Sequence, residues 1–391
     1  MLHLIRENKN AFYVFDMRTL KDRIGWLRSR LPGGTGLCYA VKANPFVLRE
    51  IRNDPERFEI CSYGEAEICM QSGISSEKMV ISGVYKTPET LEKLVADASF
   101  RGIFTVESLL QYTQLCTYSE RFGHPIRVLL RLTNDSQFGI NEEDIVRILR
   151  ERSLHPYMHY IGLQFFSGTQ KTSIKRFHRE IVFLDEFLLR LEVETGLRLE
   201  ELEYGPGFPV DYFDSDHTDE EMLLAEVSSL LNRMVGHPKI TLEIGRSMAA
   251  SCGRYYTHIV DRKENRGQHY ALIDGGMHQL VYFGQHMAMK HPHLSVIGKP
   301  DVVPEIRWTI CGALCSMNDI VAKQVLLPEI EIGDTICFEN TGAYCAMEGM
   351  ALFLSRDLPE IYLIRENGDI VCARKHFETR ILNTPDYETE D

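Results

Sequence analysis

Residues 37–61 read LCYAVKANPFVLREIRNDPERFEIC, and this stretch holds the pattern that decides the fold. A β-rich run at 37–41 is followed by a helix-like segment and then by a second β-rich run at 58–61. Such alternation is typical of parallel β/α units. It continues to about residue 245, and the β-rich runs fall at residues 37–41, 58–61, 79–82, 102–105, 126–132, 160–165, 202–204 and 240–243. Eight units predict a closed (β/α)₈ barrel rather than an open doubly wound sheet.

The chain changes character after residue 250. Strand-like runs with few helix signals follow one another at residues 255–260, 269–273, 306–310, 335–339 and 360–364. Asn367-Gly368, between two such runs, predicts a two-residue hairpin turn. We therefore expect an α/β protein in which a TIM-type barrel precedes a mostly antiparallel C-terminal β domain.

Composition limits the partners of this protein. The 391 residues include 43 Lys and Arg against 56 Asp and Glu, a formal net charge of −13. This excess of negative charge disfavours binding to nucleic acid or to an anionic membrane surface, so we expect small molecules or proteins as partners. We find no apolar signal segment and no apolar stretch of membrane-spanning length, and we predict a cytoplasmic protein.

The ten cysteines are scattered from Cys38 to Cys372. In a long chain without an export signal, this pattern favours reduced thiols over a disulfide framework. Cys311 and Cys315 form a single CxxxC pair with no second pair and no nearby histidine ligands. We therefore expect no zinc site and no other bound metal.

The barrel predicts where the chemistry takes place. Active sites of such barrels lie at the C-terminal ends of the strands, so polar and glycine residues after a strand are candidates. The candidates are Lys42 after the first predicted strand, Thr169 after the sixth, Gly205 and Gly207 after the seventh, and Glu243 and Arg246 at the eighth. Together they suit a phosphate-bearing cofactor with a carbonyl group. Taken singly, each has a simpler interpretation as a solvated lysine, a turn or a surface ion pair.

The ordered motifs YAVKAN, SGTQ, GPGFPV, EIGR, CGALCSMND and GAY resemble those of the fold-type III pyridoxal-phosphate (PLP) decarboxylases, which include the diaminopimelate, ornithine and arginine decarboxylases. The resemblance extends from about residue 12 to residue 365. It implies an alanine racemase-like fold with a PLP-binding barrel at 16–248 and a β domain formed by 1–15 and 249–391. It also implies a head-to-tail homodimer with shared active sites.

The resemblance assigns a role to each matching residue. Lys42 would hold PLP covalently through its amine, and Glu243 would pair with the pyridinium nitrogen so that the ring accepts electrons. Cys315, delivered by the partner subunit, would return a proton to the substrate Cα. The remaining cofactor-binding residues would be Thr169, Gly205, Gly207, Gly245, Arg246 and Tyr344.

Several positions depart from the family pattern. Phe166 stands where a histidine usually stacks on the cofactor ring, and Pro206 removes one backbone N–H from the phosphate turn. Ser316 replaces the acidic residue that reads a distal amino group, and Tyr282 stands near the position of a carboxylate-binding arginine. Glu348, in a usually hydroxyl-rich segment, is a third candidate for substrate contact.

These departures resemble the members of the family that act in natural-product pathways on amino acids attached to a carrier protein, peptide or nucleotide. We therefore expect decarboxylation of an attached amino-acid moiety. The alternatives are decarboxylation of a free basic amino acid or diaminopimelate, and a catalytically dead regulatory protein of the same fold. A racemase is disfavoured because Glu243 supports the electron sink that racemases of this class avoid.

Overall fold

The structure, a computed structural model, describes residues 2–285, 288–300 and 302–386. The chain divides into two compact units. We call Lys21–Val210 with Thr218–Met248 the barrel unit, and Met1–Leu20, Asp211–His217 and Ala249–Asp391 the β unit. Residues 1, 286–287, 301 and 387–391 of the expected β domain lie outside the described residues.

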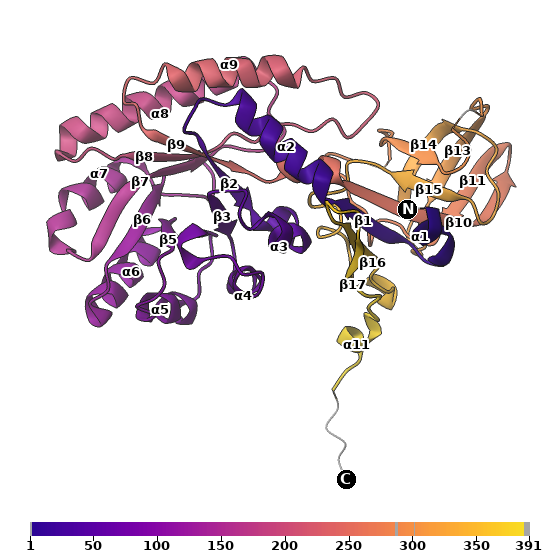
Figure 1. The fold of residues 1–391 in the computed structure, drawn as a ribbon, viewed down its shortest axis with the longest axis horizontal. Helices are drawn as coiled ribbons and strands as arrows, with labels where there is room; N and C mark the ends of the chain where they lie inside the picture. The colour runs from indigo at the N-terminus through magenta and orange to yellow at the C-terminus, as the bar shows by residue number, and fades with distance from the viewer. Residues whose placement is uncertain (1, 286–287, 301, 387–391) are drawn as a thin grey trace, which may run out of the picture. The chain divides into compact units, whose positions relative to one another are not determined.

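The barrel unit contains eight parallel strands that close on themselves (Figure 1). They are β2 Gly36–Ala40, β3 Arg57–Ile60, β4 Met79–Ile81, β5 Ile103–Val106, β6 Ile126–Arg131, β7 Met158–Phe166, β8 Glu201–Gly205 and β9 Lys239–Ile244. Closure is made by β2, which pairs with β3 on one side and β9 on the other. Each strand coincides with one of the eight predicted runs, so the predicted barrel is confirmed.

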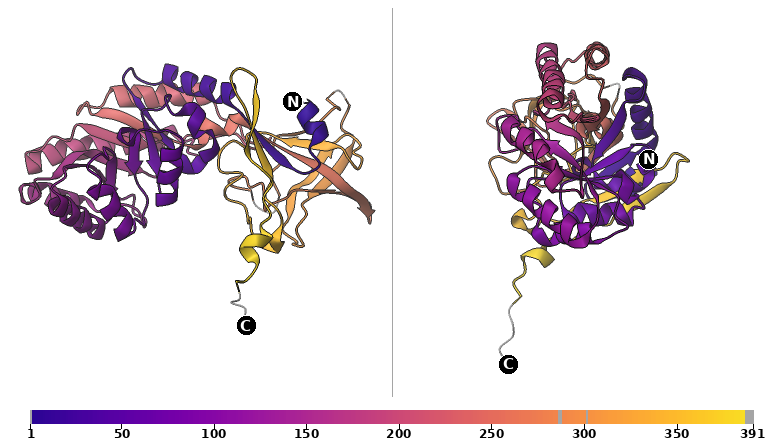
Figure 2. Two further views of the ribbon diagram at one scale, coloured as in Figure 1. Left: turned by 60° about the horizontal axis from the view of Figure 1, so that its bottom comes forward. Right: turned by 90° about the vertical axis from the view of Figure 1, so that its left-hand side faces the viewer.

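Helices surround these strands (Figures 1 and 2). They are α2 Met17–Arg30, α3 Leu48–Ile51, α4 Tyr63–Gln71, α5 Pro88–Ala96, α6 Leu109–Phe122, α7 Glu142–Arg150, α8 Ile174–Thr195, α9 Glu220–Asn232 and α10 Arg246–Ala249.

Three helix start signals can be recognised in the sequence: the capping boxes Ser62–Glu65 and Thr218–Glu221, and Thr87-Pro88 with proline at the first helical position. The hydroxyls of Ser62 and Thr87 accept the expected N-terminal hydrogen bonds of α4 and α5. The capping box expected at Thr218 is wrong, because Asp219 caps α9 by accepting from the Met222 N–H.

The β unit is built on a nine-stranded sheet. Its strands are β1 Phe12–Asp16, β10 Gly253–Asn265, β11 Gln268–Ile273, β12 Leu294–Val296, β13 Ile306–Cys311, β14 Ile320–Leu327, β15 Thr335–Phe338, β16 Glu360–Ile364 and β17 Ile370–Arg374. Among the strands of the described residues, only the β1–β16 and β11–β13 pairs are parallel, which confirms a mostly antiparallel sheet. The Asn367-Gly368 turn joins β16 and β17, and Gly368 has a φ of +89°. The unit also carries the short helices α1 Leu2–Glu7 and α11 Arg380–Asn383.

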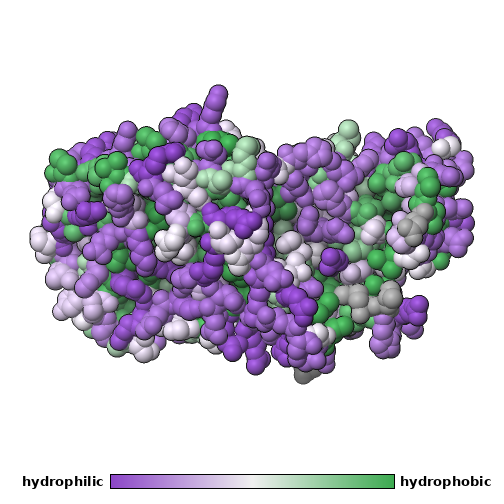
Figure 3. Space-filling view, turned by 45° about the horizontal axis from the view of Figure 1, so that its top comes forward, coloured by the Kyte–Doolittle hydropathy of each residue, from purple (hydrophilic) through white to green (hydrophobic). Residues whose placement is uncertain are grey.

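On the face drawn in Figure 3, the surface is mostly hydrophilic, with scattered hydrophobic residues. Within the part of the chain that the structure describes, no helix combines the length and apolarity needed to cross a membrane.

The inside of the barrel carries buried charge next to its apolar packing. Arg57 on β3 contacts Glu201 at 2.6 Å and Glu203 at 3.2 Å, both on β8. Burial raises the pKa of Glu203 to about 8, with Glu243 adding to the shift and Arg57 opposing it. One Glu203 oxygen, Oε1, is buried without a hydrogen-bond partner among the described residues. Glu203 is therefore held in a site that favours its protonated form.

This placement predicts a pH dependence of stability. Between pH about 4.5 and about 8, folded Glu203 retains a proton that the unfolded chain releases, so its contribution to the free energy of unfolding falls as pH rises. In urea titrations at several pH values, Glu203→Gln should lose less stability toward alkaline pH than the wild type. Glu200→Gln, a nearby exposed substitution, should follow the wild type. Parallel curves for Glu203→Gln and the wild type would contradict this assignment.

Candidate active site

Lys42 lies in the one-turn helix η1 (Val41–Ala43), directly after β2. Its ammonium contacts the Glu59 carboxylate, lies 3.5 Å from Cys61 Sγ and is 3.8 Å from Glu243 Oε1. Glu59 is on β3 and Glu243 is on β9, the two neighbours of β2. Barrel closure therefore brings these groups together at the C-terminal ends of three strands.

Glu59 and Glu243 compete for the same cation. Their side chains are only 4% and 8% exposed. Burial acts to raise the pKa of Glu59, but the Lys42 ammonium and the Cys61 hydrogen bond outweigh it, and the net shift is downward. The pKa of Glu243 is raised, by burial and by the negative charge of Glu59. In this arrangement Glu59 is the better-neutralised carboxylate, and Glu243 is the one that a further cation would stabilise.

A buried amide supports Glu243 from β7. Gln164 Nε2 donates to Glu243 Oε2 at 2.8 Å. The other amide atom, Gln164 Oε1, is buried and has no hydrogen-bond partner among the residues described. Buried polar atoms are nearly always paired, so an unpaired one beside a buried carboxylate indicates room for a ligand with a donor.

The glycine-rich loop after β8 touches the loop after β7 through backbone atoms. Gly207 has a φ of +62°, and a Cβ there would lie 1.9 Å from the Gly168 carbonyl oxygen. At Gly205, the last residue of β8, a Cβ would lie 2.5 Å from the Phe166 ring. Only glycine permits both approaches. Phe166 thus packs on the glycine loop.

Arg246 and Thr169 meet beside these loops. Arg246 Nε donates to Thr169 Oγ1 at 3.2 Å, and the arginine is 8% exposed. Gly245 is the single residue between β9 and α10, so it sets where Arg246 leaves the strand. The structure therefore places one guanidinium, one hydroxyl beside a glycine and the glycine-rich turn in the barrel unit, as the sequence predicts.

A buried ionic cluster stands behind the Thr169 loop. Lys171 Nζ donates to Ser167 Oγ at 2.9 Å and to Glu180 Oε2 at 2.6 Å. The Tyr204 hydroxyl donates to the same carboxylate at 2.7 Å, and the Lys171 N–H donates to the Gly207 carbonyl at 2.9 Å. These bonds tie the segment 167–171 to α8 and to the loop after β8. The cluster fixes the position of the Thr169 loop.

The other predicted site residues lie in the β unit. Cys315 is exposed in the loop 312–319 between β13 and β14, and Ser316 follows it. Asp319 closes this loop: its carboxylate accepts from the Leu314 N–H at 2.7 Å and the Met277 N–H at 2.8 Å. Asp319 is 2% exposed, so it shapes the loop that carries Cys315.

Three further candidates belong to this unit. Tyr344 has a φ of +67°, its carbonyl accepts from the Glu348 N–H at 3.0 Å, and the Glu348 side chain is exposed. Tyr282 is 4% exposed and packs on Tyr212, while its hydroxyl donates to the Glu339 carbonyl at 2.6 Å. This placement gives Tyr282 a packing role and does not favour contact with substrate.

Some residues that lie around Lys42 were not predicted from the sequence as site residues. Glu59 and Cys61 lie at the end of the second barrel strand and Gln164 lies within the sixth, positions that the same strand-end rule covers. Lys171 and Asp319 left no such signal, because they lie in loops rather than directly at the end of a barrel strand, and their roles depend on how those loops fold. In the described ranges no group of three or more His, Cys, Asp or Glu side chains is arranged to hold a metal ion.

Residues 12–342 match the family described as "Pyridoxal-dependent decarboxylase, C-terminal sheet domain", which is well over half of the chain. The protein belongs to this decarboxylase family. The activity is that of a PLP-dependent amino-acid decarboxylase, a carboxy-lyase, and the cofactor is PLP.

Curated relatives of this decarboxylase are distant but match along nearly the whole chain. It is 24% identical to the L-glutamyl-[BtrI acyl-carrier protein] decarboxylase of Niallia circulans, covering 95% of this chain and 92% of the relative. It is 25% identical to the diaminopimelate decarboxylase of Aquifex aeolicus, covering 93% and 88%. The 2-[(L-alanin-3-ylcarbamoyl)methyl]-2-hydroxybutanedioate decarboxylase of Staphylococcus aureus is 26% identical, covering 91% and 95%.

Solved structures confirm the fold of this decarboxylase. The crystal structure of diaminopimelate decarboxylase from M. jannaschii superposes with a TM-score of 0.86 at 21% identity, covering 100% of this chain and 94% of that chain.

The barrel unit of the decarboxylase fits PLP. Glu243 is a buried carboxylate that a protonated ring nitrogen would stabilise, and Gln164 Oε1 lacks a partner among the described residues. Arg246 and Thr169 could hold a phosphate with charge-assisted and hydroxyl hydrogen bonds. Pro206 supplies no N–H between the two glycines, so the donors must come from its neighbours.

The cluster behind the Thr169 loop predicts an effect on cofactor retention. Lys171→Met would leave Ser167 and Glu180 without their shared donor and loosen the loop, so we expect the dissociation constant of PLP to rise about tenfold. Equilibrium titration, followed by the absorbance of the bound cofactor, measures this constant. Lys175→Met, four residues along the chain and exposed, should bind PLP like the wild type. Equal PLP affinity in Lys171→Met and Lys175→Met would show that the cluster does not position the loop.

Proposed function

We propose that this decarboxylase removes the α-carboxyl of an amino-acid moiety attached to a larger carrier, peptide or nucleotide. The observation that carries the proposal is the Cys315 loop. Ser316 takes the place of the acidic residue that the family resemblance predicts, and the one acidic side chain in the loop, Asp319, is buried and bonded to two backbone N–H groups. The loop thus offers no free carboxylate to bind the distal amine of a free diamino acid.

The activities named for two relatives support this proposal. One is a decarboxylase of an L-glutamyl group on an acyl-carrier protein, and another acts on an alanin-3-yl group joined to a hydroxybutanedioate through a carbamoylmethyl link. Several other relatives are named diaminopimelate decarboxylases, so diaminopimelate is the competing substrate to test.

In this proposal the barrel residues bind and orient the cofactor. Lys42 holds PLP through its amine, Phe166 stacks on the ring, and Glu243 keeps a proton on the ring nitrogen. PLP, when bound, supplies an electron sink for the pair released as carbon dioxide departs.

Other residues complete the proposed site. The phosphate is held by Thr169, the backbone around Gly205, Gly207 and Gly245, Arg246 and Tyr344. Cys315 returns a proton to the substrate Cα from its thiol. Glu348 and Ser316 contact the substrate.

A substrate comparison tests the proposal. We expect carbon dioxide release from a conjugate joined through the side chain, such as the γ-L-glutamyl thioester of pantetheine with its α-carboxylate free, at least about tenfold faster in kcat/KM than from free L-glutamate, L-ornithine or diaminopimelate. Lys42→Ala should abolish release from every substrate. Ser316→Asp should raise activity toward ornithine, because it restores a charge partner for the distal amine. Rapid release from free diaminopimelate or ornithine by the wild type would contradict the proposal.

We also propose a homodimer in which each active site takes Lys42 from one subunit and Cys315 from the other. The β unit exposes Met317, 94% accessible beside Cys315, and apolar residues between 347 and 354. Such exposed apolar side chains are typical of a surface that a partner covers.

Mixing of variants tests the shared site. Lys42→Ala and Cys315→Ala are each expected to be inactive alone. After subunit exchange, random pairing should restore about a quarter of the wild-type activity, because half the dimers are mixed and each mixed dimer has one intact site. Exchange is verified by mass-tagged subunits. No recovery in verified mixed dimers would show that both residues act within one subunit.

A further inference from the structure

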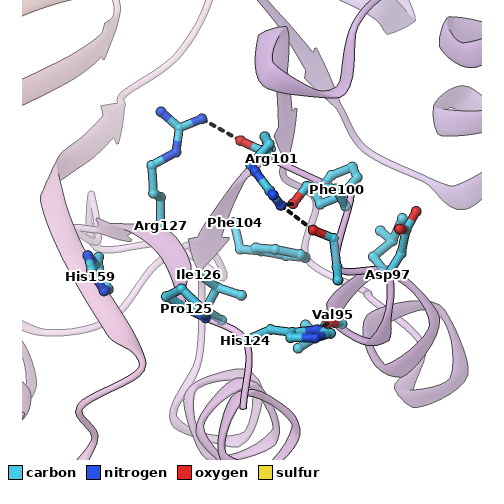
Figure 4. A pocket seen from close by; sticks show the side chains of 13 residues that line it. Val95, Asp97, Phe100, Arg101, Phe104, His124, Pro125, Ile126, Arg127 and His159 are labelled. Atoms are coloured by element: carbon cyan, nitrogen blue, oxygen red, sulfur yellow. Dashed lines mark hydrogen bonds between the residues drawn. The ribbon is translucent and has the colours of Figure 1, made fainter. Parts of the chain in front are cut away.

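A cavity lies in the barrel unit, at the end of the barrel opposite to Lys42. It has a volume of about 490 Å³ and lies where β5, β6 and β7 begin, next to the connection between α5 and β5. Figure 4 shows its side chains coming from these elements. Lys42, Thr169 and Arg246 all follow the ends of strands, so this cavity is separate from the proposed PLP site.

The cavity is lined by cationic side chains on one part and apolar ones on another. Its basic groups are Arg101, Arg127, His124 and His159. Its apolar lining includes Leu94, Phe100, Phe104 and Ile126. Such a combination of an apolar lining with a few convergent polar groups is characteristic of small-molecule sites, and the volume lies within their usual range of roughly 300–1,000 Å³.

The two arginines are held in place without a carboxylate partner. The Arg127 guanidinium donates to the Arg101 carbonyl, and Arg101 Nη1 donates to the Phe100 carbonyl at 3.2 Å. Neither forms a salt bridge with any residue in the described ranges, whereas about half of the arginines of the barrel unit do, Arg57 and Arg131 among them. Burial lowers the pKa of Arg127, and the positive charge of Arg57 adds to the shift, while the more distant carboxylates of Glu201 and Glu77 oppose it only in part. Arg127 is thus a half-buried cation whose charge an anion would compensate.

The single carboxylate that lines the cavity, Asp97, forms no salt bridge with Arg127 or Arg101; hydrogen bonds from Ser99 lower its pKa, and the charge of Arg101 adds only a minor share. Asp97 Oδ1 accepts from the Ser99 N–H at 2.8 Å and from the Ser99 hydroxyl at 2.6 Å. Figure 4 shows Asp97 on one side of the cavity and Arg127 with His159 on the other. His124 Nδ1 lies 3.0 Å from the Val95 carbonyl, which fixes the imidazole at the cavity wall.

We propose that this cavity binds a small organic anion with an apolar body: a carboxylate or phosphate placed against Arg127 and Arg101, and an aromatic or aliphatic group against Phe100 and Phe104. Guanidinium groups bind such anions through paired N–H donors. The chain has a net charge of −13, so a general attraction of anions by the whole protein would not account for such binding. The proposal does not depend on which substrate is decarboxylated.

Calorimetric titration of the PLP-loaded enzyme, freed of excess cofactor, with phenylphosphate tests the proposal. We expect saturable binding with a dissociation constant below about 1 mM, and much weaker binding of the neutral analogue benzyl alcohol. The double variant Arg101→Gln with Arg127→Gln should raise the dissociation constant at least about tenfold. Arg233→Gln, which removes an exposed arginine of the barrel unit outside the cavity, should leave it unchanged.

A second variant separates loss of binding from unfolding of the double arginine variant. Ala98→Trp fills the cavity from an exposed loop position without changing its charge, and it should also abolish binding while the absorbance of bound PLP stays unaltered. Absence of saturable phenylphosphate binding would overturn the proposal. So would binding that is unaffected by both cavity variants, or that Arg233→Gln weakens as much as they do.

Discussion

Two buried carboxylates share one ammonium at the mouth of the barrel, and the organisation of the site depends on this constraint. Glu59 and Glu243 reach Lys42 from the two strands that flank β2, so closure of the barrel is what brings them together. Burial and then the negative charge of Glu59 raise the pKa of Glu243, whereas the Lys42 ammonium and the Cys61 hydrogen bond outweigh burial and lower the pKa of Glu59. The charge of Arg131 lowers both pKa values without removing this difference. The site is therefore prepared for a second positive group, and a protonated pyridine ring is a group of that kind.

Buried ions elsewhere in the chain shape loops. The Lys171–Glu180 pair anchors the segment that carries Thr169, and Asp319 closes the loop that carries Cys315. The Lys171–Glu180 pair and the Asp319 carboxylate form their hydrogen bonds with neighbouring protein groups, so neither is available to bind substrate. This separation of roles explains how an acidic residue can lie in the Cys315 loop without providing a binding site for an amine.

The eight barrel strands could be predicted because parallel strands are buried on both faces and stand out as short apolar runs between helices. Lys42 and Glu243 could be predicted because active sites of barrels lie at strand ends. β14 was not predicted, since its pairing with β13 shifts register and Gln324 has a φ of +56°, which breaks the alternation of a regular strand.

The start of α9 was misjudged for a different reason: Thr218 and Asp219 are both good caps, and only the backbone path selects Asp219. Glu59 and Lys171 show a wider difficulty. Their importance arises from partners on other strands or helices, and a linear pattern does not contain those distances.

The two ends of the barrel carry incompletely neutralised groups of opposite charge. At the C-terminal ends of the strands, Glu243 is a buried carboxylate whose pKa is raised, whereas at the N-terminal ends Arg127 is a half-buried cation whose pKa is lowered despite the opposing charges of Glu201 and Glu77. β6 has six residues, so the ends are about 20 Å apart at roughly 3.3 Å per residue. Charges at that separation attract weakly compared with groups in direct contact, and the barrel wall prevents them from meeting. The charge of Arg127 therefore cannot neutralise that of Glu243. Each end must therefore be neutralised by its own surroundings, by solvent or by a ligand of the matching sign.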